Sequence, residues 1–135
     1  MEIRRATTSA EVLAAAGLFD ENPQGEATAR FLASEGHHLL IAWEGERPVG
    51  MVTGVEMTHP DKGTEMFLYE LGVAESERNR GVGSALVAAL HALARERGCY
   101  GMWVLTDLDN HAALKAYRRV PPSEEAPNHL IGWSF

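Results

Sequence analysis

The apolar positions of this chain follow two different periods, so the pattern predicts both helices and strands. Spacings of three and four residues predict helices over residues 12–19, 26–34, 84–97 and 112–119. Short runs rich in Leu, Val, Ile and aromatic residues predict strands over residues 39–43, 49–57, 66–73, 99–105 and 129–135. The resulting order, ααβββαβαβ, is that of an α/β protein.

The residues around these runs indicate how the elements connect. Thr8 or Ser9 can cap the first helix. A tight turn at residues 44–47 joins the first two strands, which therefore pair as a hairpin. Apolar residues on both faces of the strand at 66–73 predict a central position in the sheet. The strand-helix-strand unit over residues 66–105 then makes a right-handed parallel crossover.

The length of 135 residues suits one domain with its own core. No apolar run reaches the roughly 20 residues that a membrane-spanning helix needs, and a charged segment follows Met1 where a signal peptide would be apolar. We therefore expect a cytoplasmic protein that does not enter a membrane. A single cysteine, Cys99, cannot form a disulfide within the chain, and we expect it to contribute to packing.

The net charge of −7 argues against a protein that binds nucleic acid through a basic surface. An acidic protein attracts cations, so the charge favours a cationic small-molecule substrate. Many of the basic residues lie in the later helices or are Arg78 and Arg80. This local positive charge suits an anionic cofactor beside that substrate. The histidines, His37 and His38 among them, show no metal-ligand spacing. We expect them at the solvated surface and expect no metal site.

A basic segment that contains glycine, Arg-Asn-Arg-Gly-Val-Gly-Ser at residues 78–84, joins the strand at 66–73 to the following helix. The glycines allow close approach of the main chain and positive φ. The first turn of the helix adds free N–H groups and the positive end of the helix dipole. This combination predicts a phosphate-binding loop. Its sequence matches neither the P-loop motif nor the dinucleotide-binding fingerprint.

Two motifs resemble the signatures of the GNAT superfamily of N-acyltransferases. Residues 78–83 are similar to its Arg/Gln-x-x-Gly-x-Gly/Ala loop, which binds the pyrophosphate of acyl-CoA. Residues 110–117, Asn-His-Ala-Ala-Leu-Lys-Ala-Tyr, resemble its second signature, Asn-x-x-Ala-x-x-x-Tyr. The resemblance implies one N-acetyltransferase domain over residues 1–135, with helices on both faces of a mixed central sheet. It also implies acetyl-CoA as the cofactor and coenzyme A as the product.

The cofactor-binding residues that we expect lie in three places. They are Leu71, Gly72 and Val73 at the strand end, Arg78, Asn79, Arg80, Gly81, Val82, Gly83 and Ser84 in the loop, and Asn110. A bulge or a separation of strands at Gly72 would free main-chain N–H and C=O groups for the amides of the pantetheine arm. The resemblance gives Asn110 a contact with the same arm.

The proposed acid of the second signature corresponds to Tyr117. A phenol, with a pKa of about 10, stays protonated at neutral pH and can protonate a thiolate as it leaves. Two carboxylates are candidates for the base that deprotonates the incoming ammonium, Glu70 in the central strand and Asp107 after the next strand. Alternatively, Glu70 is a paired polar residue within its strand and Asp107 forms a turn or cap. The sequence leaves these alternatives open.

Within the superfamily, the chain resembles the shorter aminoglycoside 3-N-acetyltransferases. The similar segments are the aromatic-rich strand at residues 67–73, Thr106-Asp107, and more weakly Leu18-Phe19-Asp20. This resemblance implies acetylation of the 3-amine of an aminoglycoside by direct transfer, and with it antibiotic resistance. Val120-Pro121-Pro122 stands where the superfamily usually has Gly-Phe, so we expect a rebuilt acceptor pocket.

Two other functions are compatible with the cofactor motifs. Ribosomal-protein and peptide N-acetyltransferases share them, but commonly carry a glutamate where this chain has Leu105. A sensor that binds acyl-CoA without transferring it would need neither Tyr117 nor a base, so their presence favours an enzyme. The exposed final strand, with Trp133 and Phe135, also predicts a homodimer through that edge.

Overall fold

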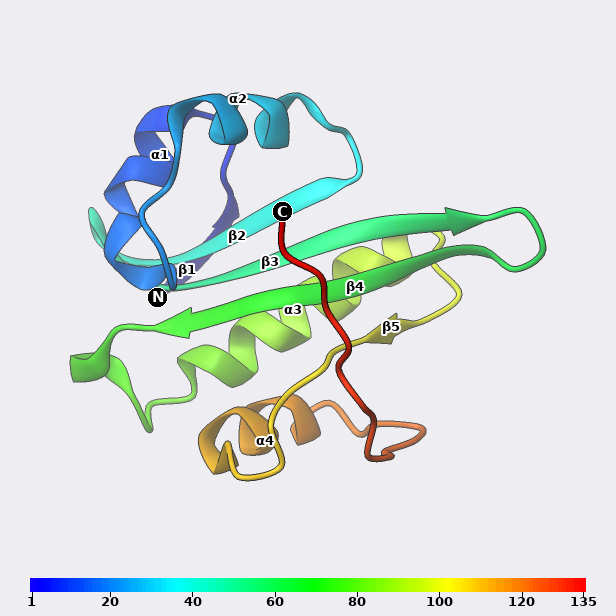
Figure 1. The fold of residues 1–135 in the computed structure, drawn as a ribbon. Helices are drawn as coiled ribbons and strands as arrows, with labels where there is room; N and C mark the ends of the chain where they lie inside the picture. Colours follow the sequence, from blue (N-terminus) through cyan, green and yellow to red (C-terminus); the bar gives the residue numbers. More distant parts are fainter.

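Five strands pair in the order β1-β2-β3-β4-β5 in the computed structural model, which describes residues 1–135 (Figure 1). The strands are β1 (Glu2–Arg5), β2 (His37–Glu44), β3 (Arg47–His59), β4 (Gly63–Val73) and β5 (Met102–Trp103). The helices are α1 (Ser9–Ala14), α2 (Gly25–Ala33), α3 (Val82–Glu96) and α4 (His111–Arg118), with short 3₁₀ turns η1 (Ala16–Leu18) and η2 (Glu75–Glu77). No helix is both long enough and apolar enough to cross a membrane.

The sheet is mixed, as the sequence predicted. The pairs from β1 to β4 are antiparallel, and β5 lies parallel to β4. Because α3 connects these two strands, the predicted parallel crossover is confirmed. The hairpin of β2 and β3 is also confirmed. The Thr8 hydroxyl caps α1, where it accepts a hydrogen bond from the main-chain N–H of Glu11 at 3.2 Å.

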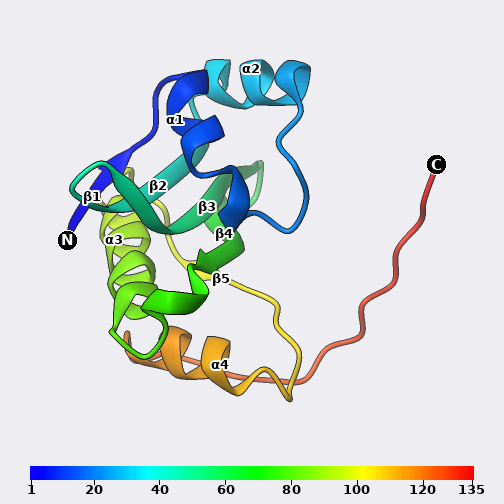
Figure 2. The same ribbon diagram turned by 90° about the vertical axis from the view of Figure 1, so that its left-hand side faces the viewer.

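Helices cover both faces of the sheet (Figure 2). On one face, α3 packs its apolar side chains, Leu86 and Leu90 among them, against β3 and β4. On the other face, α1, η1 and α2 pack against β2 and β3, with Ile41 at the centre of the contact. This second layer reaches only the C-terminal end of β4 and leaves the rest of β4 and β5 uncovered. On this part of the sheet, Phe67 stacks on Trp103 with ring centroids 4.4 Å apart.

Three parts of the sequence-based prediction were wrong. The strand β1 was not predicted, because Glu2–Arg5 contains a single apolar residue and pairs with β2 through its main chain. The buried strand predicted at residues 99–105 is only Met102–Trp103, because β4 pairs with it at just these two positions. The strand predicted at residues 129–135 is absent, because this segment has no neighbouring strand to pair with.

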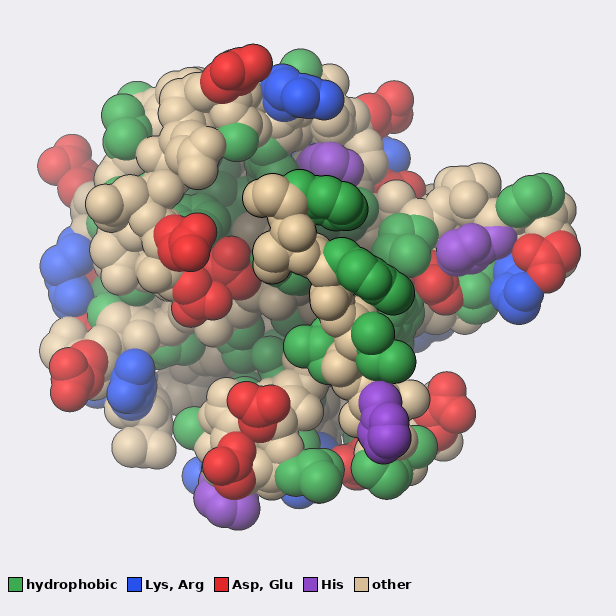
Figure 3. Space-filling view, viewed as in Figure 1, with side chains coloured by type: hydrophobic (Ala, Val, Ile, Leu, Met, Phe, Trp, Pro, Cys, Tyr) green, Lys and Arg blue, Asp and Glu red, His purple; other side chains and the backbone are tan.

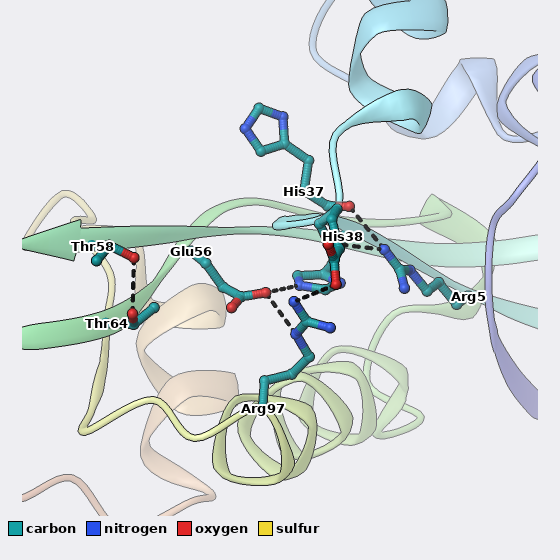
Figure 4. Close-up of polar contacts among 8 residues, drawn as sticks. Arg5, His37, His38, Glu56, Thr58, Thr64 and Arg97 are labelled. Atoms are coloured by element: carbon teal, nitrogen blue, oxygen red, sulfur yellow. Dashed lines mark hydrogen bonds and ion pairs between the residues drawn. The ribbon is translucent and has the colours of Figure 1, made fainter.

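The expectation that His38 is solvated was also wrong. This side chain is fully buried, and its Nε2 lies 2.6 Å from Glu56 Oε2, which also accepts a hydrogen bond from Arg97 Nε at 2.7 Å (Figure 4). His37, the preceding residue, directs its ring away from this cluster. The cluster joins β2 and β3 to the C-terminal end of α3. It therefore connects the sheet to the helix that follows the phosphate-binding loop.

Stability is expected to fall as the pH falls below about 6.5, the usual pKa of histidine, because burial lowers the pKa of His38 in the folded protein. The unfolded chain then binds a proton that the folded chain does not, which costs up to about 1.4 kcal/mol per pH unit until His38 also protonates. Arg5 and Arg97 lie nearby and oppose that protonation. Chemical denaturation at pH values from about 7.5 down to about 5 measures how the free energy of unfolding changes with pH.

The matched variants are His38→Gln and His37→Gln. The first should flatten the pH dependence, because glutamine has no proton to gain, whereas the second should leave it unchanged. An equal slope in all three proteins would mean that His38 is not the group responsible.

Candidate active site

The segment that the sequence predicted to bind phosphate forms a turn at the N-terminus of α3. Asn79 and Gly81 both adopt positive φ, at 63° and 80°. The main-chain N–H groups of Val82, Gly83 and Ser84 donate to no acceptor in the chain. No side chain caps this helix. Three free donors and the positive end of the helix dipole therefore meet at one point, as an anion site requires.

A buried carboxylate that the sequence analysis did not identify holds this turn in place. Glu77, 6% exposed, accepts hydrogen bonds from Arg47 at 2.8 Å and from Arg80 at 3.1 Å. The bonds from Arg47 and then Arg80 keep the pKa of Glu77 below its usual value. Arg80 is thus engaged within the protein, whereas Arg78 is exposed and forms no ion pair. Arg78 is the guanidinium that remains free for a phosphate.

The strands β4 and β5 separate beside this turn. Their pairing ends at Phe67 and Trp103, but β4 continues to Val73, so residues 68–73 have no strand on their β5 side. This arrangement provides the separation of strands expected for a pantetheine arm. The bulge, in contrast, lies at Tyr69 and Glu70, which together oppose the single residue Thr53 of β3.

Gly72 has a different role from the bulge that the sequence suggested. A Cβ atom at this position would lie 2.2 Å from the main-chain oxygen of Leu18, closer than any such contact can be. The absence of a side chain therefore lets η1 lie directly against β4. This contact brings the segment that follows η1 to the end of β4.

Residues of α4 complete the cofactor side of the candidate site. Asn110 caps this helix, since its Oδ1 accepts a hydrogen bond from the N–H of Ala113 at 3.2 Å. A Cβ on Gly83 would lie 3.5 Å from the Cβ of Ala116, so α4 packs closely against the start of α3. Tyr117 follows and packs against the same core cluster as Leu71 and Val73. Burial alone raises the pKa of Tyr117, with no hydrogen bond to its hydroxyl contributing.

The two candidate bases have different surroundings. Glu70 is partly buried beside a cavity of about 420 Å³, and its Oε2 accepts a hydrogen bond from the N–H of Asp20 at 3.3 Å. Burial, with the nearby charges of Asp20 and Glu21, raises the pKa of Glu70. Asp107 is exposed in the turn before α4, where its carbonyl accepts a hydrogen bond from the N–H of Asn110 at 3.1 Å. Of the two carboxylates, Glu70 lies beside a cavity and has a raised pKa, whereas Asp107 lies in an exposed turn.

The cavity beside Glu70 is acidic. It is lined by residues 19–24, Ala27, Tyr69 and Glu70, and contains three carboxylates but no basic side chain. Acidic side chains also gather on this face in the space-filling view, between the layer of α1 and α2 and the strand β4 (Figure 3). The sequence indicated Asp20 weakly and gave no signal for Glu21, which becomes part of the site through the contact of η1 with β4. A cavity of this charge suits a cation.

A family model for the acetyltransferase (GNAT) family matches residues 6–120, and the chain belongs to this family. It is an N-acetyltransferase that depends on acetyl-CoA. Among solved structures, the chain is similar to an aminoglycoside acetyltransferase, meta-AAC0020, from an uncultured soil metagenomic sample, in complex with sisomicin. The TM-score is 0.90 at 19% identity, over 99% of this chain and 95% of that one.

Two further structures have the same fold. Aminoglycoside N-acetyltransferase AAC(6')-Iy in complex with CoA gives a TM-score of 0.79 at 21% identity, over 99% of this chain and 98% of that one. Aminoglycoside acetyltransferase HMB0005, also from an uncultured soil metagenomic sample, gives 0.78 at 26% identity, over 99% and 100%. These similarities confirm the predicted GNAT fold. None of these three proteins is named as a 3-N-acetyltransferase.

Proposed function

We propose that this protein, as one domain over residues 1–135, acetylates a primary amine of an aminoglycoside. The acidic cavity beside Glu70 is the observation that carries the proposal. An aminoglycoside bears several ammonium groups, and Asp20, Glu21 and Glu70 offer them three carboxylates within one cavity. The names of similar structures support the same acceptor class. Acetyl-CoA binds in this proposal where β4 and β5 separate, beside the turn at the start of α3.

The reaction that we propose is direct transfer. Glu70 accepts the ammonium proton of the acceptor, directly or through a water molecule, and the amine attacks the thioester carbonyl. Main-chain N–H groups of Leu71 to Val73 stabilise the oxyanion. The C–S bond then breaks as the amide forms, and Tyr117 donates its proton to the thiolate of coenzyme A. The second proton of the amine nitrogen passes to the resulting tyrosinate, directly or through water, and restores the phenol. No covalent acyl-enzyme is required, and Cys99 lies at the opposite end of β5 from these residues.

The pyrophosphate of the cofactor binds in this proposal to the free N–H groups of Val82, Gly83 and Ser84, with Arg78 as the free charge. Asn110 keeps its amide nitrogen available for the pantetheine arm, because its Oδ1 caps α4.

Release of free thiol from acetyl-CoA tests the acceptor. We expect thiol release with aminoglycosides, and little with polyamines, with peptides from ribosomal-protein N-termini, or without acceptor. Release with the peptides alone would contradict the proposal in favour of a peptide N-acetyltransferase. Cofactor binding without release for any acceptor would support a sensor.

The position of acetylation is tested on the product. The sequence resemblance predicts the 3-amine, whereas AAC(6')-Iy is named for the 6'-amine. Two-dimensional NMR of the acetylated aminoglycoside distinguishes the two amines, because acetylation shifts the proton on the adjacent carbon. A product acetylated only at the 6'-amine would overturn the predicted regiochemistry and leave the acceptor class intact.

Arg78→Gln should raise the Kd of acetyl-CoA roughly fivefold, because an exposed charge-assisted hydrogen bond to phosphate contributes about 1 kcal/mol. Isothermal titration calorimetry at low and high salt measures the effect, which should shrink as salt screens the charge. Arg95→Gln is the matched control, since it removes the same charge at the far end of α3. An equal loss of affinity for acetyl-CoA in both variants would mean that Arg78 contributes only to the overall electrostatic field of the protein.

A further inference from the structure

The bulge in β4 changes which face of the sheet the following side chains meet. In a regular strand, alternate residues point to the same face. The side chains of β4 that pack on the α3 side of the sheet are Met66, Leu68, Leu71 and Val73. The alternation therefore shifts by one residue after Leu68, and Tyr69 and Glu70 both line the acidic cavity on the other face. Without the extra residue, Glu70 would point toward α3.

Thr53 is the residue of β3 that opposes this bulge. Its hydroxyl accepts a hydrogen bond from the main-chain N–H of Glu70 at 3.0 Å. A bulge interrupts the ladder of main-chain hydrogen bonds, and an N–H that loses its partner away from water is unfavourable. The side chain of Thr53 thus supplies an acceptor at the point where the ladder is interrupted.

The place of Thr53 in the core indicates that its hydroxyl has a specific role. Thr53 is 7% exposed, and the residues before it in β3, Met51 and Val52, are apolar and also buried. A buried hydroxyl is favourable only when it forms a hydrogen bond. Thr53 does not line the cavity itself, so this bond is directed to the main chain of Glu70 and not to a bound molecule.

Two hydrogen bonds therefore hold Glu70 from different sides. Thr53 in β3 binds its main-chain N–H, and the N–H of Asp20, in the segment after η1, donates to its carboxylate at 3.3 Å. The first bond fixes the main chain of the bulge, and the second fixes the end of the side chain. Together they direct the carboxylate into the cavity.

We propose that Thr53 is a positioning residue for acetyl transfer, because its hydroxyl holds the bulge in the form that directs Glu70 into the cavity. This inference rests on the proposed function, in which Glu70 is the base. A base must lie within hydrogen-bond reach of the proton that it accepts, and a misplacement of about 1 Å can cost about 10²-fold in rate. Thr53 lies outside both the cavity and the turn at the start of α3, so it should affect transfer and not cofactor binding.

Substitution of Thr53 is the first test. Thr53→Val removes the hydroxyl but keeps the branched shape and the strand preference of the side chain. It should lower kcat roughly 10- to 100-fold and leave the Kd of acetyl-CoA unchanged. Thr53→Ser keeps the hydroxyl and should retain most of the activity. Full activity in Thr53→Val would overturn the proposal. A large loss in Thr53→Ser would also overturn it, even if Thr53→Val did not fold.

Thr58→Val is the matched control. The hydroxyls of Thr58 and Thr64 lie 2.8 Å apart and join the same two strands, β3 and β4, far from the bulge (Figure 4). This variant also removes a hydroxyl that bonds across the two strands, and it should keep the kcat of the unmodified protein. An equal loss of kcat in Thr58→Val and Thr53→Val would mean that the effect is a general one on the sheet and would overturn the proposal.

A double-mutant cycle tests whether Thr53 acts through Glu70. The Glu70→Gln background has no base to position, so adding Thr53→Val should lower kcat no further. A further loss as large as in the unmodified background would overturn the proposal, because Thr53 would then act independently of Glu70. Thiol release by the unmodified protein with aminoglycosides separates this failure from that of the proposed function. Release that Thr53→Val leaves unchanged removes only the role of Thr53, whereas no release at all would overturn the proposed function and this role with it.

Discussion

Glu70→Gln should lower kcat by about 10²- to 10⁴-fold, the usual contribution of a positioned general base. Glutamine keeps the oxygen that accepts the N–H of Asp20, so the loop beside the cavity is preserved. It cannot accept the ammonium proton, however, and the amine then stays protonated. The KM of acetyl-CoA should change little, because the turn proposed to bind the cofactor lies at the start of α3 and does not line this cavity. Steady-state kinetics with a saturating aminoglycoside measures both quantities.

The pH dependence of kcat/KM provides a second readout for the same residue. A base must be deprotonated to act, so the rate should rise with pH through the pKa of Glu70. Burial raises this pKa, so the acidic limb should lie above the range of an exposed carboxylate. Glu70→Gln should abolish this limb. Asp107→Asn is the matched control and should keep both the limb and most of kcat. If Asp107→Asn were the inactive variant, the assignment of the base would be reversed.

Tyr117→Phe should reduce kcat by about 10²-fold or more, the lower range for general acid catalysis, and leave the Kd of acetyl-CoA nearly unchanged. Burial raises the pKa of Tyr117, so the phenol remains protonated at neutral pH and can serve as a proton donor. No hydrogen bond acts on its hydroxyl within the chain, so the substitution should not cost stability. Single-turnover kinetics and calorimetry separate the effect on transfer from the effect on binding.

Tyr100→Phe is the control for this substitution. The Tyr100 hydroxyl donates to Glu65 at the far end of the β3–β4 hairpin, and we expect full activity without it. Unchanged turnover in Tyr117→Phe would remove this phenol from the mechanism, and water would then have to protonate the thiolate. A large loss in both variants would indicate a structural effect of the substitutions.

Much of the fold could be predicted because its signals are local. Thr8 and Asn110 cap helices within four residues of their partners, and the glycines of the phosphate-binding turn lie beside the helix that they begin. A strand, in contrast, exists only where a neighbour pairs with it. The apolar run at residues 129–135 has the composition of a strand but no neighbour in its own chain, and Glu2–Arg5 has a neighbour but little apolar signal.

The residues missed at the site depend on contacts between distant segments. Glu77 is important because Arg47, 30 residues earlier, reaches it across the fold. Glu21 becomes part of the cavity because Gly72 lets η1 lie against β4. The choice between the two candidate bases also depends on contacts between distant segments. The sequence alone does not distinguish Glu70 from Asp107 as the base. In the structure, Glu70 lies beside the cavity whereas Asp107 lies in an exposed turn.

The close contact between Gly72 and Leu18 sets the position of the segment that follows η1 relative to β4. Residues 19–24 form one wall of the cavity, and none of them belongs to the turn at the start of α3. If the proposed function holds, substitutions in this wall should change which amine is accepted and leave the turn at the start of α3 unchanged. A library that randomises residues 19–24 and keeps Gly72 would therefore show whether this wall selects the acceptor.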